Sequence, residues 1–251
     1  MHYVAIGDSF TEGVGDDLPG DRVRGWADLV AAGLAASGQE VWYANLAIRG
    51  RLIGPIIDEQ LEPALALSPA PDLMTFVGGG NDMMRPGFDP ARVLALTEQV
   101  VDRCAEVGTK LVVMSGGDPT VNLPRGQIVR SRADAFMIQM SAFIASHEHV
   151  TFVDNYSDVE LRRREYWAED RLHLNPLGHA RVAARVLAAL GVDTELPVAG
   201  NEASVNAGAI GEARYIARHV MPWIGRRLTG RSSGDGRVPK QPDWVKMEAA
   251  S

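Results

Sequence analysis

The chain has 251 residues, 46% hydrophobic and 23% charged, which is the composition of a globular protein with one sizeable core. A net charge of −7 argues against nucleic acid as a partner, because phosphate binding needs clustered positive charge. The single cysteine, Cys104, excludes an intrachain disulfide framework, and no apolar run reaches the ~20 residues of a membrane span. A first strand expected almost at Met1 leaves no room for a signal peptide, so we expect a cytoplasmic protein.

Short apolar runs alternate with longer segments of helical periodicity along most of the chain. The runs are Tyr3–Gly7, Val41–Asn45, Leu73–Val77, Lys110–Ser115 and Thr151–Asp154. The helical segments are Trp26–Ser37, Ile53–Leu67, Pro90–Val107, Gln127–Ser146 and Pro176–Leu190. Short apolar strands that alternate with helices are typical of a parallel sheet buried on both faces. The sequence therefore predicts an α/β fold.

A polar cluster follows each predicted strand. The clusters are Gly7–Ser9, Asn45–Gly50, Gly78–Asp82, Gly116–Asp118 and Asp154–Asn155. Ligands of parallel α/β sheets bind beyond the carboxyl ends of the strands, so these clusters are expected to converge on one edge of the sheet. That edge is the predicted functional site.

Ser9 follows the first predicted strand, and Asp170 and His173 lie three positions apart much later in the chain. A serine attacks a carbonyl when an imidazole takes its proton and a carboxylate orients the imidazole. Taken alone, Ser9 is better explained as a residue that caps a helix or closes a turn. A tight turn brings positions three apart within about 7 Å, so one loop can carry both acid and base.

The residues after His173 predict how its charge is set. Asn175-Pro176 is typical of a helix start, with an N-cap followed by proline at the first helical position. The positive end of that helix disfavours an imidazolium ion. We therefore expect His173 to be neutral and able to accept a proton.

Asn81 and Gly50 are candidates for stabilising an oxyanion, which acyl transfer does with preorganised hydrogen-bond donors. Asn81 can present its amide N–H₂ at a strand end, and the glycines before it allow a sharp turn. Gly50 can offer an unobstructed backbone N–H, although it could also be a plain turn glycine. The backbone N–H of Ser9 would be the third donor.

Over roughly the first 190 residues, the sequence resembles the SGNH (GDSL-type) hydrolases. The resemblance rests on four blocks, which are Gly-Asp-Ser, the Gly50 segment, Gly-x-Asn-Asp and Asp-x-x-His. One departure is Phe10, where the family name has leucine. The resemblance implies a flavodoxin-like three-layer α/β/α sandwich with a five-stranded parallel sheet. It also implies the site residues, with no cofactor and no metal: catalytic Ser9, Asp170 and His173, and an oxyanion hole of Ser9, Gly50 and Asn81.

The function expected from these residues is that of a serine esterase that hydrolyses an acyl or acetyl ester of a small molecule through an acyl-enzyme on Ser9. An acyltransferase would use the same triad with an alcohol as acceptor. A non-catalytic module that binds carbohydrate or lipid is the alternative from another class. The loops near 16–24, 85–88 and 118–125 are expected to form the pocket walls.

Residues 192–251 change in character and are separated from the predicted hydrolase domain at residues 1–191. We expect a linker, an amphipathic helix at Glu212–Leu228 and a flexible tail. Basic side chains flank the apolar stripe of that helix: Arg214, Arg218, Arg226 and Arg227. The helix could make weak contact with an anionic membrane surface, cover an acyl pocket, or pack on the main domain with its arginines in solvent.

Overall fold

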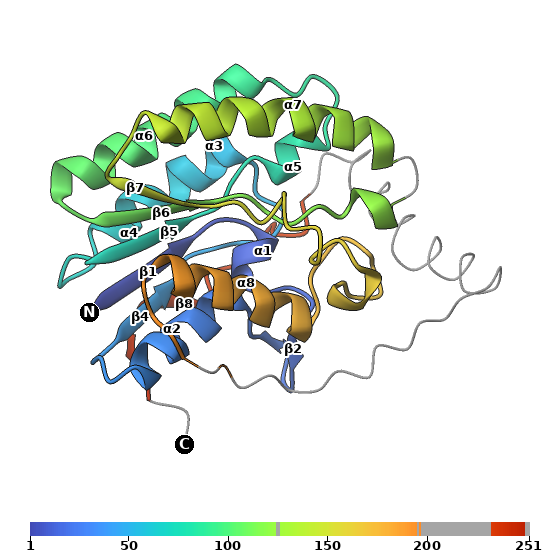
Figure 1. The fold of residues 1–251 in the computed structure, drawn as a ribbon. Helices are drawn as coiled ribbons and strands as arrows, with labels where there is room; N and C mark the ends of the chain where they lie inside the picture. The colour runs from blue at the N-terminus through green and yellow to red at the C-terminus, as the bar shows by residue number, and fades with distance from the viewer. Residues whose placement is uncertain (124–125, 195, 197–231, 249–251) are drawn as a thin grey trace.

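The computed structural model describes residues 1–123, 126–194, 196 and 232–248, so the basic helix predicted at Glu212–Leu228 lies outside the described residues. A central sheet has the strand order β7-β6-β5-β1-β4-β8 (Figure 1). Its strands are β1 (His2–Ile6), β4 (Trp42–Asn45), β5 (Leu73–Phe76), β6 (Lys110–Met114), β7 (Val150–Val153) and β8 (Gln241–Lys246). The first five are parallel and follow the flavodoxin-like order.

The sixth strand corrects the predicted count of five. β8 pairs antiparallel with β4 at one edge of the sheet, and it comes from the segment that we expected to be a flexible tail. The segment gave no strand signal because it contains Pro242 and Asp243, residue types that are depleted in strands. An edge strand tolerates proline because one side of its backbone needs no partner. The division of the chain at residue 191 stays a prediction.

Helices cover both faces of the sheet (Figure 1). One face carries α2 (Trp26–Ala36) and α8 (Pro176–Ala189). The other carries α3 (Ile53–Ile56), the π-helix η1 (Ile57–Leu61), α4 (Glu62–Leu65), α6 (Pro90–Val107) and α7 (Gly126–Ala145). The alternation of a strand explains both cores, since Tyr3 and Ala5 of β1 pack beneath α2 and α8, whereas Val4 and Ile6 pack beneath the other layer.

The remaining elements are short and lie in the connections. They are α1 (Ser9–Glu12), the hairpin β2 (Asp17–Leu18) and β3 (Arg22–Val23), α5 (Gly80–Met83), and the 3₁₀ turns η2 (Thr120–Asn122) and η3 (Arg164–Tyr166). Two of them, α1 and α5, directly follow β1 and β5. These connections therefore place Ser9 and Asn81 at the carboxyl end of the sheet.

The helix predicted over Ile53–Leu67 is interrupted by the π-helix η1. Pro63 lacks the N–H that an uninterrupted α-helix would direct to residue 59, which favours a change of register here. The π-turn carries the buried Gln60, whose side chain accepts a hydrogen bond from Gly7 N (2.8 Å) and donates one to Gly7 O (3.0 Å). Gln60 thereby fixes the backbone two residues before Ser9.

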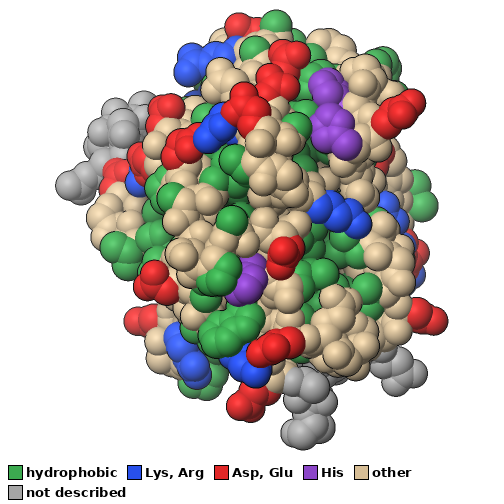
Figure 2. Space-filling view, turned by 90° about the vertical axis from the view of Figure 1, so that its left-hand side faces the viewer, with side chains coloured by type: hydrophobic (Ala, Val, Ile, Leu, Met, Phe, Trp, Pro, Cys, Tyr) green, Lys and Arg blue, Asp and Glu red, His purple; other side chains and the backbone are tan. Residues whose placement is uncertain are grey.

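The side of the molecule on which β1 begins shows Lys, Arg, Asp and Glu side chains interspersed with apolar ones (Figure 2). Within the described part of the chain, no helix combines the length and apolar character needed to cross a membrane. The clustered polar loops lie at the opposite end of the strands.

We predict that Gln60→Leu destabilises the fold by about 2–3 kcal/mol, because the N–H and C=O of Gly7 would stay buried without their partner. Urea unfolding would measure the change. The matched control is Gln39→Leu, since Gln39 bonds Ser37 at an exposed site and should change the free energy of unfolding by less than about 0.5 kcal/mol. Equal effects of the two substitutions would contradict the role given to Gln60.

Candidate active site

Ser9, His173 and Asp170 form a continuous chain of hydrogen bonds. Ser9 opens α1 directly after β1, and its Oγ lies 3.0 Å from His173 Nε2. His173 Nδ1 lies 2.5 Å from Asp170 Oδ2. The structure thus brings together a hydroxyl, an imidazole and a carboxylate that the sequence places up to 164 positions apart. This order of groups can activate a serine as a nucleophile.

The loop of Asp170 and His173 is a tight turn that the acid itself holds. Asp170 Oδ1 accepts hydrogen bonds from the backbone N–H groups of Leu172 and His173, both at 3.0 Å. Arg171 adopts a positive φ of 60°, which the turn requires. On the far side, Asn175 caps α8 by accepting from Gly178 N at 3.1 Å, as its sequence predicts. Both ends of the loop are therefore fixed.

Asp170 and burial have opposite effects on the pKa of His173. Burial alone would lower the pKa of His173, but the charge and hydrogen bond of Asp170 raise it above its ordinary value. The prediction of a neutral His173 rested on the helix start, whereas the largest influence that raises the pKa is the carboxylate in contact with the imidazole. That His173 is neutral and accepts a proton stays a prediction. Burial likewise opposes the ionised form of Asp170, yet the charge of His173 and its hydrogen bonds hold the pKa of that carboxyl well below its usual range.

The side chain of Asn81 is hydrogen-bonded to Asp8, the residue that precedes Ser9. Its Nδ2 donates to Asp8 Oδ2 (2.9 Å) and to Arg51 O (3.0 Å), so both of its hydrogens have protein acceptors. Asp8 Oδ1 in turn accepts from Phe10 N and caps α1. Burial of the Asp8 carboxyl raises its pKa to about 6. An oxyanion on the substrate would have to replace one acceptor of Asn81.

Gly50 lies on a loop that is hydrogen-bonded to Glu12 through the neighbouring Arg49. The carboxylate of Glu12 accepts from Arg49 N (2.6 Å) and from Arg49 Nε (2.8 Å). Gly50 has a φ of 76°, and the next residue is Arg51, whose carbonyl contacts Asn81. Gly50 does not line the pocket described below. Our sequence reasoning missed Glu12 and Arg49, although an acid within the Gly-Asp-Ser block and an arginine beside Gly50 were visible as a complementary pair.

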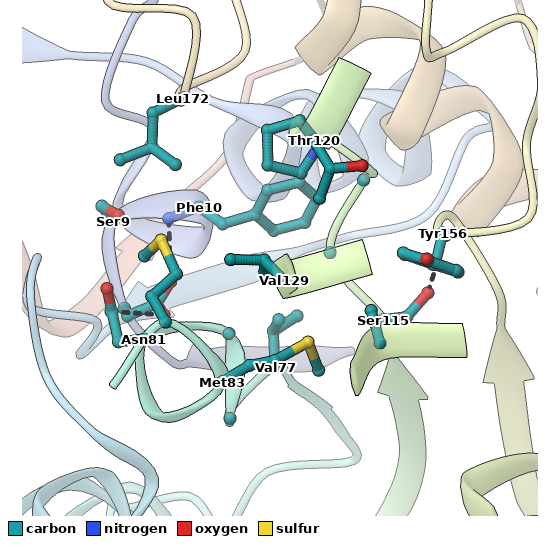
Figure 3. Close-up of a pocket in the computed structure, with 18 of the residues that line it drawn as sticks. Ser9, Phe10, Val77, Asn81, Met83, Ser115, Thr120, Val129, Tyr156 and Leu172 are labelled. Carbon is teal, nitrogen blue, oxygen red and sulfur yellow. Dashed lines mark hydrogen bonds between the residues drawn. The ribbon is translucent and has the colours of Figure 1, made fainter. Parts of the chain in front are cut away.

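A pocket with a cavity volume of about 160 Å³ extends from Ser9 along α7. Figure 3 shows Ser9 and Asn81 at one end and Ser115 and Tyr156 at the other. The lining between them is mostly apolar: Val77, Met83, Met114, Val129, Ala133, Phe136, Met137 and Met140. The expected wall at 118–125 contributes Pro119, Thr120 and Leu123, but the loops at 16–24 and 85–88 contribute none. The α7 wall was not predicted.

The chemistry of the site is that of serine, histidine and carboxylate side chains. Among the residues that the structure describes, no group of three or more His, Cys, Asp or Glu side chains could hold a metal ion. The only cysteine of the sequence, Cys104, lies on the buried face of α6. The arrangement suits acyl transfer through an activated hydroxyl.

A sequence model described as the GDSL-like Lipase/Acylhydrolase family matches residues 5–181. Among solved structures, LAE5, an alpha/beta hydrolase enzyme from the metagenome of Lake Arreo, is 22% identical with a TM-score of 0.64, covering 77% of this chain and 96% of its own. TesA is also 22% identical, with a TM-score of 0.62, covering 76% of this chain and 98% of its own. A catalytic mutant of Axe2, an acetylxylan esterase from Geobacillus stearothermophilus, is 18% identical with a TM-score of 0.61, covering 76% of this chain and 94% of its own. No curated protein matches. The chain therefore belongs to the GDSL-like lipase/acylhydrolase family and is an ester-hydrolysing enzyme.

Proposed function

We propose that the protein is a serine esterase that forms an acyl-enzyme on Ser9 and acts on esters with an apolar acyl group. The observation that carries this proposal is the chain of contacts from Ser9 Oγ to His173 Nε2 (3.0 Å) and from His173 Nδ1 to Asp170 Oδ2 (2.5 Å). A lone serine is inert at neutral pH, whereas this arrangement supplies both a base and a group that orients the base.

In the proposed reaction, Ser9 Oγ attacks the ester carbonyl carbon while His173 Nε2 takes the hydroxyl proton. The carbonyl oxygen becomes an oxyanion, for which the donors are the backbone N–H groups of Ser9 and Gly50 and the amide of Asn81. The ester C–O bond then breaks, and the alcohol leaves with the proton from His173. A water, deprotonated by the same imidazole, attacks the acyl carbon. The bond from that carbon to Ser9 Oγ then breaks, and His173 returns the proton to Oγ, which restores Ser9 and releases the carboxylic acid.

The pocket supports an apolar acyl group rather than a sugar-borne acetyl group as the preferred substrate. Its walls along α7 and β6 are methionine, phenylalanine and aliphatic side chains, which bind hydrocarbon and offer few partners to hydroxyl groups. An acyl chain entering from Ser9 would pass Val129, which Figure 3 shows between the two ends of the pocket. Methionine adapts to chains of different length, so a range of acyl groups is expected.

An acyltransferase remains the second candidate, since the same residues would carry the acyl-enzyme and only the acceptor would differ. Product analysis with a competing alcohol separates the two reactions. Ester formed in excess over acid at low alcohol concentration would favour the transferase, and acid alone would favour hydrolysis.

Ser9→Ala should abolish turnover of p-nitrophenyl butyrate and labelling by a fluorophosphonate probe, because both need the Ser9 oxygen. The small side chain leaves the packing intact, so the thermal unfolding midpoint should stay within a few degrees of wild type. The measurements are initial rates, labelling detected by mass spectrometry, and circular dichroism melting. A Ser9→Ala enzyme that keeps most of its activity would overturn the proposed function.

The pH profile should report the raised pKa of His173. The base must be neutral to take the Ser9 proton, so kcat/KM is expected to rise with pH through a midpoint above the ordinary 6.5. Asp170→Asn removes the charge that raises the pKa, while burial, which lowers it, remains. The midpoint should therefore move to lower pH and kcat should fall about 10⁴-fold. An unchanged midpoint in the variant would contradict this coupling.

The acyl pocket predicts a chain-length preference that one substitution can reverse. Along p-nitrophenyl esters from acetate to octanoate, kcat/KM should rise about threefold to fourfold per methylene until the pocket is full. Val129→Trp fills the pocket and should lower the octanoate-to-acetate ratio at least about tenfold. The control is Ile128→Trp on the same helix, 58% exposed and outside the lining, which should leave the ratio unchanged. Equal ratios for both variants would place the acyl chain elsewhere.

A further inference from the structure

The C-terminal segment of residues 232–248, which we name the brace, is attached to the strand that leads into the Gly50 loop. Its strand β8 pairs with β4 in the register Trp42↔Lys246, Tyr43↔Val245 and Asn45↔Gln241. The pairing shifts between Tyr43 and Asn45, just before β4 passes into the loop. The brace therefore reaches the loop at the residues that set its direction.

The turn of the brace lies directly on the loop. Ser232 Oγ donates a hydrogen bond to Gly50 O at 3.2 Å, and Gly234 N donates to Ser232 Oγ at 3.2 Å. The backbones approach so closely that a Cβ on Gly234 would lie 2.2 Å from Arg49 O, and a Cβ on Gly50 would lie 2.5 Å from Ser232 Oγ. Glycine is thus required on both sides of this contact.

Lys240 connects the brace to α1, the short helix that begins with Ser9, and to Asp28 of α2. Its Nζ donates to the carbonyl of Glu12 (2.6 Å), the last residue of α1, and forms an ion pair with Asp28 (2.6 Å). The side chain of Lys240 is only 18% exposed, so this anchor is largely shielded from water. The same Glu12 holds Arg49 through its carboxylate. The loop is therefore held by Glu12 on one side and by the brace on the other.

The brace lies outside the part of the chain that the family shares. The family match ends at residue 181. The three structures described above are themselves covered over 94–98% of their length, yet they cover only 76–77% of this chain. The brace thus belongs to the part of the chain that follows the family match.

We propose that the brace is a positioning element that holds the backbone N–H of Gly50 in place for the oxyanion. This inference rests on the proposed function, because it gives Gly50 the role of an oxyanion donor. Such donors work by being preorganised, and a displaced donor weakens an interaction that exists only in the transition state. A disturbed brace should therefore lower kcat and leave KM nearly unchanged.

The test compares two alanine substitutions in the same turn of the full-length enzyme. Gly234→Ala places a Cβ against Arg49 O and must push the brace and the loop apart. A Cβ on Gly236 meets no atom within 4 Å, but its φ of 73° strains an alanine there, so this variant is the control for backbone strain in the brace without a clash against the loop. Both residues are tested with p-nitrophenyl butyrate, with rates normalised to active sites titrated by the initial burst. Gly234→Ala should lower kcat about tenfold with KM within about twofold, and Gly236→Ala should leave both within about twofold.

Two further measurements separate positioning from loss of structure. Ser232→Ala removes the hydrogen bond to Gly50 without adding bulk, and its kcat should fall about threefold in a protein that melts as wild type does. An alkylboronic acid, which forms a tetrahedral adduct on a serine, should bind Gly234→Ala more weakly by about the same factor as kcat falls. Asn81→Ala gives the effect of removing a whole oxyanion donor for comparison, and its kcat should fall by a factor of about 10²–10³.

The outcomes for the brace and for the proposed function are distinguishable. If Ser9→Ala is inactive but Gly234→Ala and Ser232→Ala keep wild-type kcat and boronate affinity, the brace has no positioning role and the esterase proposal stands. A rise in KM alone would also overturn the brace, because it would indicate a contact with the ground-state substrate. If Ser9→Ala stays active, the proposed function itself is wrong, and with it the role given to Gly50.

Discussion

The contact between Asp170 and His173 is the interaction on which the site depends, because it reverses the effect of burial. Partial burial of the imidazole opposes its protonation, yet the base of the proposed reaction must become an imidazolium as the nucleophile attacks. Asp170 stabilises that cation and is itself stabilised by the imidazole and by two backbone N–H groups, of Leu172 and His173. Without such partners, a charge in this partly buried position would be destabilised. The turn that joins the two residues is thus also the means by which the carboxylate stays ionised.

The block from Gly7 to Gly13 contacts the other loops through two buried acids that lie outside the chain of hydrogen bonds from Ser9 to Asp170. Asp8 caps α1 and binds Asn81, and Glu12 binds Arg49 beside Gly50. The burial of Asp8 raises its pKa to about 6, above the 3.8 of the free side chain. The raised pKa means that the folded state binds this proton more tightly, so Asp8 contributes less to stability as pH rises from about 4 through 6. Asp170, with its lowered pKa, acts in the opposite sense and loses its contribution as pH falls.

The sequence predicts those features that depend on residues close together along the chain. The five parallel strands agree with their apolar runs to within one or two residues, and the start of α8 follows from Asn175-Pro176. The missed features depend on where side chains point in three dimensions. The wall of the pocket is a face of α7 whose apolar residues could equally have faced the core, and the pairing of Glu12 with Arg49 joins loops 37 positions apart. Strand β8 forms because an open edge accepts it, which its own composition does not indicate.

The strand order separates the two tasks of the site. Ser9 follows β1, and its neighbours β4 and β5 supply the Gly50 loop and Asn81, so the proposed oxyanion donors flank the nucleophile. The pocket instead lies over the ends of β5, β6 and β7 and beneath α7, on the opposite side from β8. Under the proposed function, changes in α7 are therefore expected to alter which acyl group fits without moving the proposed donors. Changes at the β4 edge, where the brace packs, can alter the donors without reshaping the pocket. Because the two sides meet only at the end of the pocket that holds Ser9 and Asn81, we expect substrate preference and transition-state stabilisation to vary separately in this fold.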